Sequence, residues 1–334
     1  MDSPCDMRSL ARKKELRIGL ISNTNSGHNR DHLSRVNAIL DRHPCVHHVP
    51  TSHGDDVRPA LDELARREID ILAINGGDGT TAKVLGHVLD DAPFPRRPPV
   101  VVLPGGTANM TAGVVGGYGN LIDAVQRLCD WATGGRRACA HARHPILRVK
   151  LGDHGAVSYG MFLGAGTVIQ GTEYAHRAVH PLGLRGDSSL SVIVARTIWG
   201  IVRKDPRFAR PVSMGLALDD EAPLPQQEAL VLLVSSLEKL FLGIDPFWGG
   251  GDGPVRLTLI RKDPERFLRN LPSILRGRPR SRVSEATGYL SRNARSVTLW
   301  LDGAINLDGE IHHVRREDGP VRISQGGEFT FLRV

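Results

Sequence analysis

A glycine-rich run that contains one acid, Gly76-Gly77-Asp78-Gly79-Thr80-Thr81, stands between an apolar stretch and a helical apolar pattern. Glycine lets the backbone approach a ligand closely, and successive exposed N–H groups can bind an anion, as can the start of the helix that follows. An aspartate repels phosphate unless a cation lies between them, so Asp78 fits a place beside Mg²⁺ or a role in orienting the loop. The run predicts a nucleotide-phosphate site, and a plain turn in which Asp78 caps the helix is the alternative.

Two further loops of the same kind follow predicted strands. Gly105-Gly106-Thr107-Ala108-Asn109 comes after "VVVLP", and "SNTNSGHNR", which contains Asn23, Ser26 and Gly27, comes after the first strand. Loops at the ends of two buried strands can face one another across a nucleotide. Neither GxxxxGK(S/T) nor GxGxxG occurs at these turns, which excludes a Walker-type NTPase and a standard dinucleotide fold.

Two acids, Asp308 and Glu310, stand two residues apart in "NLDGEI" near the end of the chain. Alternate residues of an extended segment share a face, so one carboxylate could take a proton while the other supports a metal. Asp-Gly is also a strong hairpin signal, and "WLDGAI" with Asp302 repeats it. A simple turn is therefore the alternative.

The first half of the chain must place the glycine loops. Strand-like apolar runs at 17–22, 69–75 and 99–104 alternate with segments of helical apolar spacing, and Asn120 has the features of a helix N-cap. Strands that alternate with helices predict right-handed crossovers and a parallel sheet, which binds ligands at the carboxyl ends of its strands. We therefore expect an α/β nucleotide-binding domain over 16–140.

The second half has a different period. "ILRVKL" (146–151), "VRLTLI" (255–260) and "SVTLWL" (296–301) alternate apolar and polar residues, which predicts a mainly antiparallel β-sandwich domain over 141–317. A helix is expected within 179–203, around "LSVIVARTIWGIV". The remaining segment, 318–334, ends in the strand-like "GEFTFLRV", which can pack back on the first domain.

The net charge of 43 − 36 = +7 is concentrated in "RKDPERFLRNLPSILRGRPRSR", residues 261–282. Basic residues flank apolar ones there, a composition that suits an anionic membrane surface. A solvated basic helix and loop is the alternative. Aromatic residues are sparse and no recognition motif accompanies the charge, so nucleic acid is not expected as a partner.

Other features of the sequence indicate a cytoplasmic protein. No apolar run approaches the roughly 18–20 residues that span a bilayer, and the N-terminus lacks the apolar core of a secretory signal. The four cysteines, Cys5, Cys45, Cys129 and Cys139, are far apart and form no CxxC pair. This spacing favours reduced thiols over a disulfide framework or a zinc site.

In this order, the pieces resemble the diacylglycerol kinase catalytic family, which includes sphingosine kinases and bacterial lipid kinases. The runs that carry the resemblance are "NTNSG" (23–27), "GGDGT" (76–80), "LPGGTAN" (103–109), "GGGDGPVRLTLI" (249–260) and "NLDGE" (306–310). The resemblance implies a Rossmann-like or phosphofructokinase-like nucleotide domain, a β-sandwich domain for the lipid substrate, and an active site in the cleft between them.

The resemblance also implies cofactors and roles. ATP and Mg²⁺ would be used, with Asp308 as general base, Asp78 and Glu310 in the catalytic and metal network, and Asp252 at a structural divalent ion, unless Asp252 belongs to a simple turn. The nucleotide-site residues it implies are Asn23, Ser26, Gly27, Gly76, Gly77, Gly79, Thr80, Gly106, Thr107 and Asn109. Met110 stands where the family usually has aspartate, and a thioether cannot replace a carboxylate toward Mg²⁺.

The expected function is an ATP- and Mg²⁺-dependent lipid kinase that phosphorylates a hydroxyl of diacylglycerol or a related lipid alcohol. One alternative is a catalytically impaired homologue, marked by Met110, that binds nucleotide or lipid. A second is NAD kinase, which shares GGDGT, although the chain has no Asn-x-Gly-x-Leu-Gly-Phe run. We expect a cytoplasmic protein that associates peripherally with membranes through 261–282; a homodimer is left open.

Overall fold

A computed structural model of the chain describes residues 13, 16–116, 119–134, 139–174, 187–203, 205, 207, 208 and 210–334. Cys5 and the part of the expected helix at 179–186 lie outside the described residues. The chain divides into two compact units, Met1–His144 with Glu328–Val334, and Pro145–Gly327. These limits differ by a few residues from the 140/141 boundary inferred from sequence, and they assign the end of the chain to the first unit.

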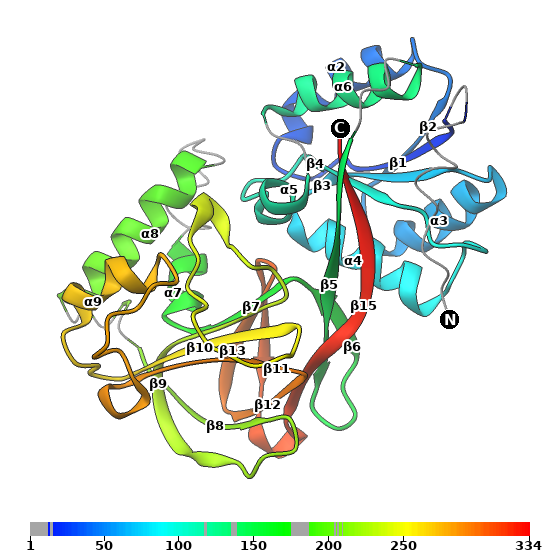
Figure 1. Ribbon diagram of the computed structural model, residues 1–334. Helices are drawn as coiled ribbons and strands as arrows, with labels where there is room; N and C mark the ends of the chain where they lie inside the picture. The colour runs from blue at the N-terminus through cyan, green and yellow to red at the C-terminus, as the bar shows by residue number, and fades with distance from the viewer. Residues whose placement is uncertain are drawn as a thin grey trace. The chain divides into compact units, whose positions relative to one another are not determined.

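The first unit is a parallel sheet with helices on both faces (Figure 1). Its elements are β1 (Ile18–Asn23), α2 (Asn29–Leu40), β2 (Val46–Thr51), η1 (Gly54–Asp56), α3 (Val57–Arg66), β3 (Ile71–Gly76), α4 (Asp78–Asp90), β4 (Val100–Pro104), α5 (Met110–Val115) and α6 (Leu121–Ala132). The strand order is β2-β1-β3-β4, and the end of β15 (Val321–Arg333) pairs in parallel with β4. Helices α2 and α6 cover one face, and α3 and α4 cover the other.

Burial explains why these segments form a parallel sheet. All six residues of β3 are buried, as a strand covered on both faces requires. Helix α6 turns its apolar stripe inward, with Leu121, Val125 and Leu128 almost fully buried against the sheet. Cys45 and Cys129 are free thiols in the same core, and burial raises the pKa of Cys129 to about 12.

The second unit is a mainly antiparallel sheet that also carries helices. Its elements are β6 (Val157–Gly160), β7 (Phe162–Gly166), α7 (Thr167–Tyr174), α8 (Asp187–Val202), β8 (Val212–Leu218), β9 (Leu224–Ser235), η4 (Phe241–Gly243), β10 (Val255–Arg261), α9 (Phe267–Ile274), η5 (Glu285–Thr287), β11 (Tyr289–Ala294), β12 (Ser296–Leu301), β13 (Gly303–Leu307), β14 (Glu310–Val314) and η6 (Arg316–Asp318). Strands β5 (Ala140–Leu151) and β15 carry the chain between the two units.

Strand pairing in the second unit follows the period-two pattern. In β12, Val297, Leu299 and Leu301 are buried while the residues between them are partly exposed. The strand order is β14-β13-β7-β9-β8-β12-β15, and every neighbouring pair in it is antiparallel. The predicted fold class, an α/β domain followed by a mainly antiparallel domain, is confirmed. The helix expected around 190–202 is α8.

Within the described residues, no helix is both long enough and apolar enough to cross a bilayer.

The Asn120 cap of α6 gives a first test of the fold. Its side-chain oxygen accepts the backbone N–H of Asp123 at 3.0 Å, as the sequence predicts for an N-cap. We expect Asn120→Ala to lower the free energy of unfolding by about 0.5–2 kcal/mol, because the first turn loses a hydrogen-bond acceptor. Asn120→Ser keeps an acceptor and should lie close to the wild type in denaturant unfolding. Equal stability of the alanine variant would show that the cap contributes nothing.

Candidate functional site

Three loops leave neighbouring strands at the same edge of the parallel sheet. They follow β1, β3 and β4 and lead into α2, α4 and α5. Because β3 pairs in parallel with both β1 and β4, the carboxyl ends of the three strands lie next to one another. This is the edge at which open α/β sheets bind ligands. The sequence prediction that the two glycine loops face one another is tested by the contacts between them.

A fully buried asparagine joins the first loop to the second. The Asn29 side-chain nitrogen donates to the backbone oxygens of Asn23 and Asn75, at 2.7 and 3.1 Å, and lies 3.0 Å from the Ser26 hydroxyl. Asn23 in turn donates to the Thr80 hydroxyl at 2.8 Å. Asn29 was not among the predicted site residues, although a signal exists: it lies seven residues before Val36 and so on the buried face of α2.

The first loop also contacts the third. The Ser26 hydroxyl donates to the backbone oxygen of Gly105 at 3.0 Å, and the His28 amide donates to the same oxygen at 2.9 Å. A Cβ added at Gly27 would lie 2.3 Å from the Thr107 hydroxyl oxygen. Ser26, Gly27 and Thr107, all predicted from the motifs, are therefore neighbours in the structure.

The second and third loops touch through glycines. A Cβ added at Gly106 would lie 2.3 Å from the Cα of Gly77, which is closer than side-chain carbons approach a backbone. Asn109 closes the third loop on itself: its side-chain oxygen accepts the Gly106 amide at 2.7 Å, and its backbone is left-handed, with φ of 52°. Glycine is thus required at position 106 by the approach of one loop to the other.

Asp78 joins the starts of two helices. It is the first residue of α4, and its carboxylate accepts the amides of Met110 and Thr111, the first residues of α5, at 3.1 and 2.7 Å. Only 9% of Asp78 is exposed, and burial raises the pKa of its carboxyl against the opposing effect of these hydrogen bonds. This geometry orients the third loop on the second, which is one of the two roles expected for Asp78. Its metal role stays a prediction.

Met110 belongs to the core as well as to the loop. Its side chain is 6% exposed in the first turn of α5, while its amide donates to Asp78. A buried thioether thus stands where the resemblance implies a carboxylate, and the backbone at this position makes the contact between the loops.

The N-terminus of α4 is the part of the site suited to phosphate. The amides of Gly79 and Thr80 lie in its first turn, and no hydrogen bond involves either of them within the described residues. Such amides, together with the helix dipole, attract anions. The Asp78 charge is held on the amides of α5 instead. The amides of Gly79 and Thr80 therefore fit a phosphate oxygen.

The late acidic pair lies in a hairpin of the second unit. Leu307 pairs with Glu310, and the two residues between them, Asp308 and Gly309, have φ of 47° and 95°. Two positive φ values at an Asp-Gly step are typical of a tight hairpin turn. Of the two readings of this motif, the structure shows the hairpin turn: the chain reverses at Asp308, so the two acids do not lie on one face of an extended segment. Glu310 is exposed at the start of β14, whereas Asp308 is 9% exposed.

The Asp308 carboxylate is held by the strand beside it. Its two oxygens accept the amides of Met161 and Phe162, each at 2.9 Å, and its own amide donates to the Phe162 oxygen at 3.0 Å. Asp252 is exposed and lies in the loop before β10. Within the described residues, no three His, Cys, Asp or Glu side chains gather in a way that could hold a metal ion.

Comparison with known proteins agrees with this geometry. Residues 17–135 match the family model described as the diacylglycerol kinase catalytic domain. The matched segment holds all three loops of the candidate site. The resemblance inferred from GGDGT and LPGGTAN is confirmed, because both runs lie inside the matched segment.

Solved structures from Bacillus anthracis strain Sterne share the fold across both units. One, described as a diacylglycerol kinase, aligns with a TM-score of 0.57 and 18% identity over 96% of this chain and 97% of that chain. Two others, provisionally assigned as diacylglycerol kinases, align with TM-scores of 0.62 and 0.60 at 18% and 17% identity, with the same coverage. No curated protein is significantly similar to the chain.

Substitution of Gly106 tests whether the loops must touch. We expect Gly106→Ala to lower the free energy of unfolding by about 1–3 kcal/mol, because its methyl group would overlap the Gly77 backbone. Gly113→Ala is the matched control: Gly113 is in α5, and a Cβ there would meet nothing within 4 Å. The control should be neutral, or more stable by up to about 1 kcal/mol. A Gly106→Ala protein as stable as its control would contradict the close packing.

The burial of Asp78 has a pH signature. A raised folded-state pKa means that the folded chain keeps this proton to higher pH than the unfolded chain, whose carboxyl titrates near the ordinary value of about 3.9. The free energy of unfolding should therefore fall as pH rises between these two pKa values and then level off. Denaturant unfolding of wild type and Asp78→Asn across acidic pH measures the contribution of this carboxyl. The contribution is the difference between the free energies of unfolding of the two proteins at each pH. A difference that grows in favour of wild type as pH rises would show the opposite shift.

Proposed function

We propose that the protein is an ATP- and Mg²⁺-dependent kinase that transfers a phosphoryl group to a hydroxyl of diacylglycerol or a related lipid alcohol. The observation that carries the proposal is the packing of three strand-end loops around the N-terminus of α4, inside the segment that matches the diacylglycerol kinase catalytic domain. Phosphoryl transfer requires mainly that groups be positioned and charge offset, and a rigid set of amides and hydroxyls does both.

Each predicted residue has a part in this proposal. The amides of Gly79 and Thr80 bind phosphate oxygens, and Asn23, Ser26, Thr107 and Asn109 fix the loops that surround them. Bound Mg²⁺ would offset charge on the phosphate oxygens. Asp78, Glu310 and Asp252 remain the proposed carboxylates for metal. Glu310 and Asp252 are exposed, so a hydrated ion can reach them.

Asp308 is the proposed general base. The acceptor hydroxyl gives its proton to the Asp308 carboxylate while its oxygen bonds to the γ-phosphorus, and the bond from that phosphorus to the β-phosphate oxygen breaks to release ADP. The amides of Met161 and Phe162 hold the carboxylate in one orientation, which favours proton transfer in a fixed direction.

The second unit offers apolar surface for an acyl chain. Two apolar segments, 161–171 and 190–202, are the candidates for this surface, and they fall in β7 with α7 and in α8. Helix α8 is rich in apolar residues, yet Ile193, Val194, Ile198 and Ile201 are only partly buried. An apolar helix with incomplete burial is suited to contact with a lipid chain.

Met110 favours a second candidate function, a homologue that binds nucleotide or lipid without efficient turnover. Its buried thioether supplies no oxygen to a metal. The two candidates differ in turnover and agree in nucleotide binding, so an activity measurement separates them.

The test is a panel of lipid alcohols, with NAD⁺ included, incubated with γ-labelled ATP and Mg²⁺ and resolved by chromatography. We expect label in a diacylglycerol-like lipid and none in NADP⁺. Asp308→Asn should lower kcat by about 10²–10⁴-fold because the hydroxyl loses its base. Asp302→Asn changes the other Asp-Gly turn and should leave kcat unchanged. Nucleotide binding without any labelled product would support the second candidate and contradict the kinase.

A further inference from the structure

Three large apolar side chains are exposed in the second unit. They are Trp199 of α8, Leu242 of η4 and Leu268 of α9, with 54%, 42% and 57% of their surfaces exposed. No other large hydrophobic residue in the described part of the chain is exposed to this degree. Single exposed hydrophobics are ordinary, but a group on adjoining elements marks an interaction surface.

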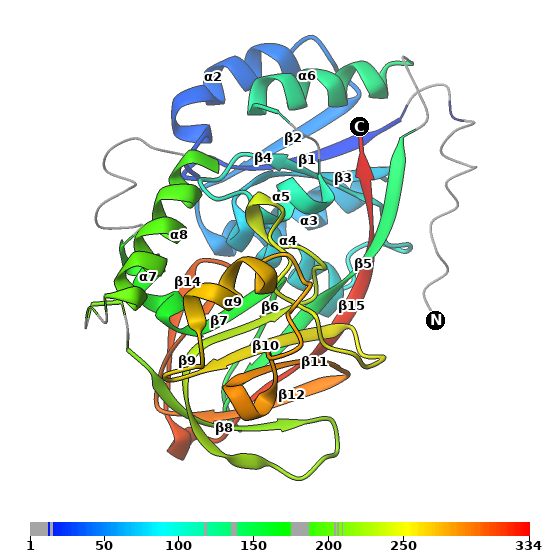
Figure 2. The same cartoon turned by 60° about the vertical axis from the view of Figure 1, so that its left-hand side comes forward.

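The three elements adjoin one another. The turn η4 packs against α8. Two residues beyond η4, the Asp245 amide donates to the Leu275 oxygen at 2.9 Å, and Asp245 forms an isolated parallel bridge with Arg276, just after α9. The turn therefore lies between the two helices. Figures 1 and 2 show α7, α8 and α9 on one side of the strands of the second unit.

The anchoring of α9 explains why Leu268 points outward. Asn270 and Ile274, one turn apart, are 4% and 1% exposed, and Ile274 packs with Tyr289 in a small core. Asn270 also donates to the Glu265 oxygen at 3.1 Å. At roughly 100° per residue, Leu268 lies about 200° around the helix from Asn270. The inward face is fixed by packing, so the outward face keeps its leucine in solvent.

Basic residues surround these apolar side chains. Arg203, Arg269 and Arg276 are exposed, and none of them forms an ion pair within the described residues. Arg203 lies over the Trp199 ring, 4.7 Å from its centroid, so a cation and an indole are presented together. We call Trp199, Arg203, Leu242, Leu268, Arg269 and Arg276 the α8–α9 surface.

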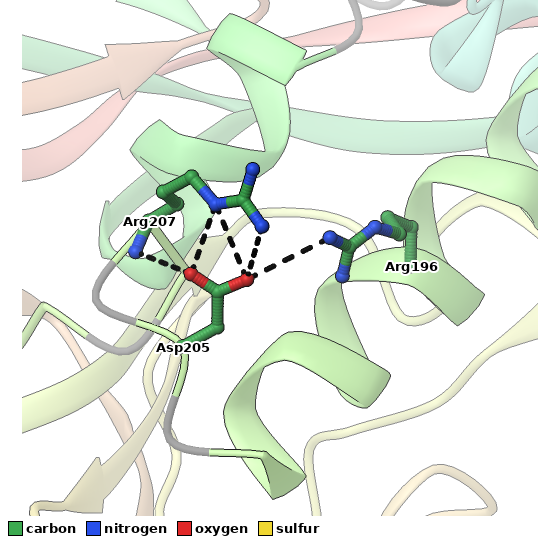
Figure 3. Close-up of polar contacts among 3 residues, drawn as sticks. All are labelled: Arg196, Asp205 and Arg207. Atoms are coloured by element: carbon green, nitrogen blue, oxygen red, sulfur yellow. Dashed lines mark hydrogen bonds and ion pairs between the residues drawn. The ribbon is translucent and has the colours of Figure 1, made fainter.

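Two nearby arginines are excluded from this surface. Figure 3 shows Asp205 between Arg207, which binds it at 2.8 Å, and Arg196 at 3.7 Å. Hydrogen bonds from Arg207 lower the pKa of Asp205 to about 2, so its carboxylate stays ionised near neutral pH and offsets this charge. Asp205 offsets one of these two charges, so we assign to the surface Arg203, Arg269 and Arg276, which form no ion pair within the described residues.

We propose that the α8–α9 surface docks the protein on an anionic lipid bilayer, with its three apolar side chains entering the interface and its three arginines meeting lipid headgroups. Interfacial binding combines buried apolar area with attraction between basic residues and anionic lipids, and tryptophan is favoured at the headgroup level. The inference rests on the proposed function, in which the acceptor lipid comes from a membrane. It extends the basic segment 261–282 to residues of α8 and η4.

The test is sedimentation of the whole protein with vesicles of phosphatidylcholine, alone or mixed with phosphatidylserine, at about 0.1 M salt, where the Debye length is about 10 Å. We expect binding to the anionic vesicles only. Trp199→Ala/Leu268→Ser should weaken it roughly tenfold or more through lost apolar burial. Arg269→Gln/Arg276→Gln should weaken it roughly 25-fold, about fivefold for each arginine.

The matched control is Arg35→Gln/Arg292→Gln, which removes the same charge from exposed positions outside this surface that also form no ion pair within the described residues, and it should bind as wild type does. Equal binding to neutral and anionic vesicles, or equal losses in the control, would overturn the proposal. So would binding that depends on the arginines but not on Trp199 and Leu268 and that nucleic acid displaces, because this would indicate a general polyanion surface.

Turnover with a short-chain diacylglycerol in detergent separates this proposal from the proposed kinase. The Arg269→Gln/Arg276→Gln variant should retain wild-type turnover there, because the acceptor no longer comes from a bilayer. Turnover in detergent without vesicle binding would reject the docking surface and keep the kinase. Vesicle binding that the variants weaken as expected, without any turnover, would keep the docking surface and reject the kinase.

Discussion

The candidate site depends on one steric constraint: three loops leave adjacent parallel strands and must pack against one another within the strand spacing of roughly 4.8 Å. At Gly106 a side chain would overlap the Gly77 backbone, so glycine is the residue that permits the contact. Asp78 then fixes the contact by accepting two amides from the start of α5. The Asp78 carboxylate is therefore bound to amides of α5. The amides of Gly79 and Thr80 in the first turn of α4, which have no hydrogen-bond partner within the described residues, can bind an anion.

In the second unit, the Asp308 carboxylate is held by backbone amides in the same way as that of Asp78. Asp308 also has 9% of its surface exposed, and it also accepts two successive backbone amides. Asp78 binds the start of the next loop and so positions backbone, whereas Asp308 lies in a hairpin turn and presents a fixed carboxylate. Two amide donors on the two oxygens of one carboxyl group fix its direction, so each acid is held in one orientation. In the proposed function, Asp78 positions backbone and Asp308 takes the proton.

The local patterns of the sequence predict much of this fold, whereas the contacts across the chain are not visible in them. Continuous apolar runs predict β3, alternation predicts β12, and the cap signal predicts the start of α6. The partners of Asp78 lie 32 and 33 residues away, and those of Asp308 lie about 146 residues away, distances at which periodicity carries no information. Asn29 was missed because its role depends on hydrogen bonds to the backbone oxygens of Asn23 and Asn75. The sequence shows only a polar residue near the start of a helix. The α8–α9 surface likewise joins residues from three separate segments.

Amide hydrogen exchange of the whole protein, with and without ATP and Mg²⁺, tests the central claim most directly. The account predicts that nucleotide slows exchange in segments 23–29, 76–81 and 105–111 together, since these loops form one packed unit around the start of α4. Bound nucleotide that protects other segments of the first unit and leaves 76–81 unchanged would contradict it.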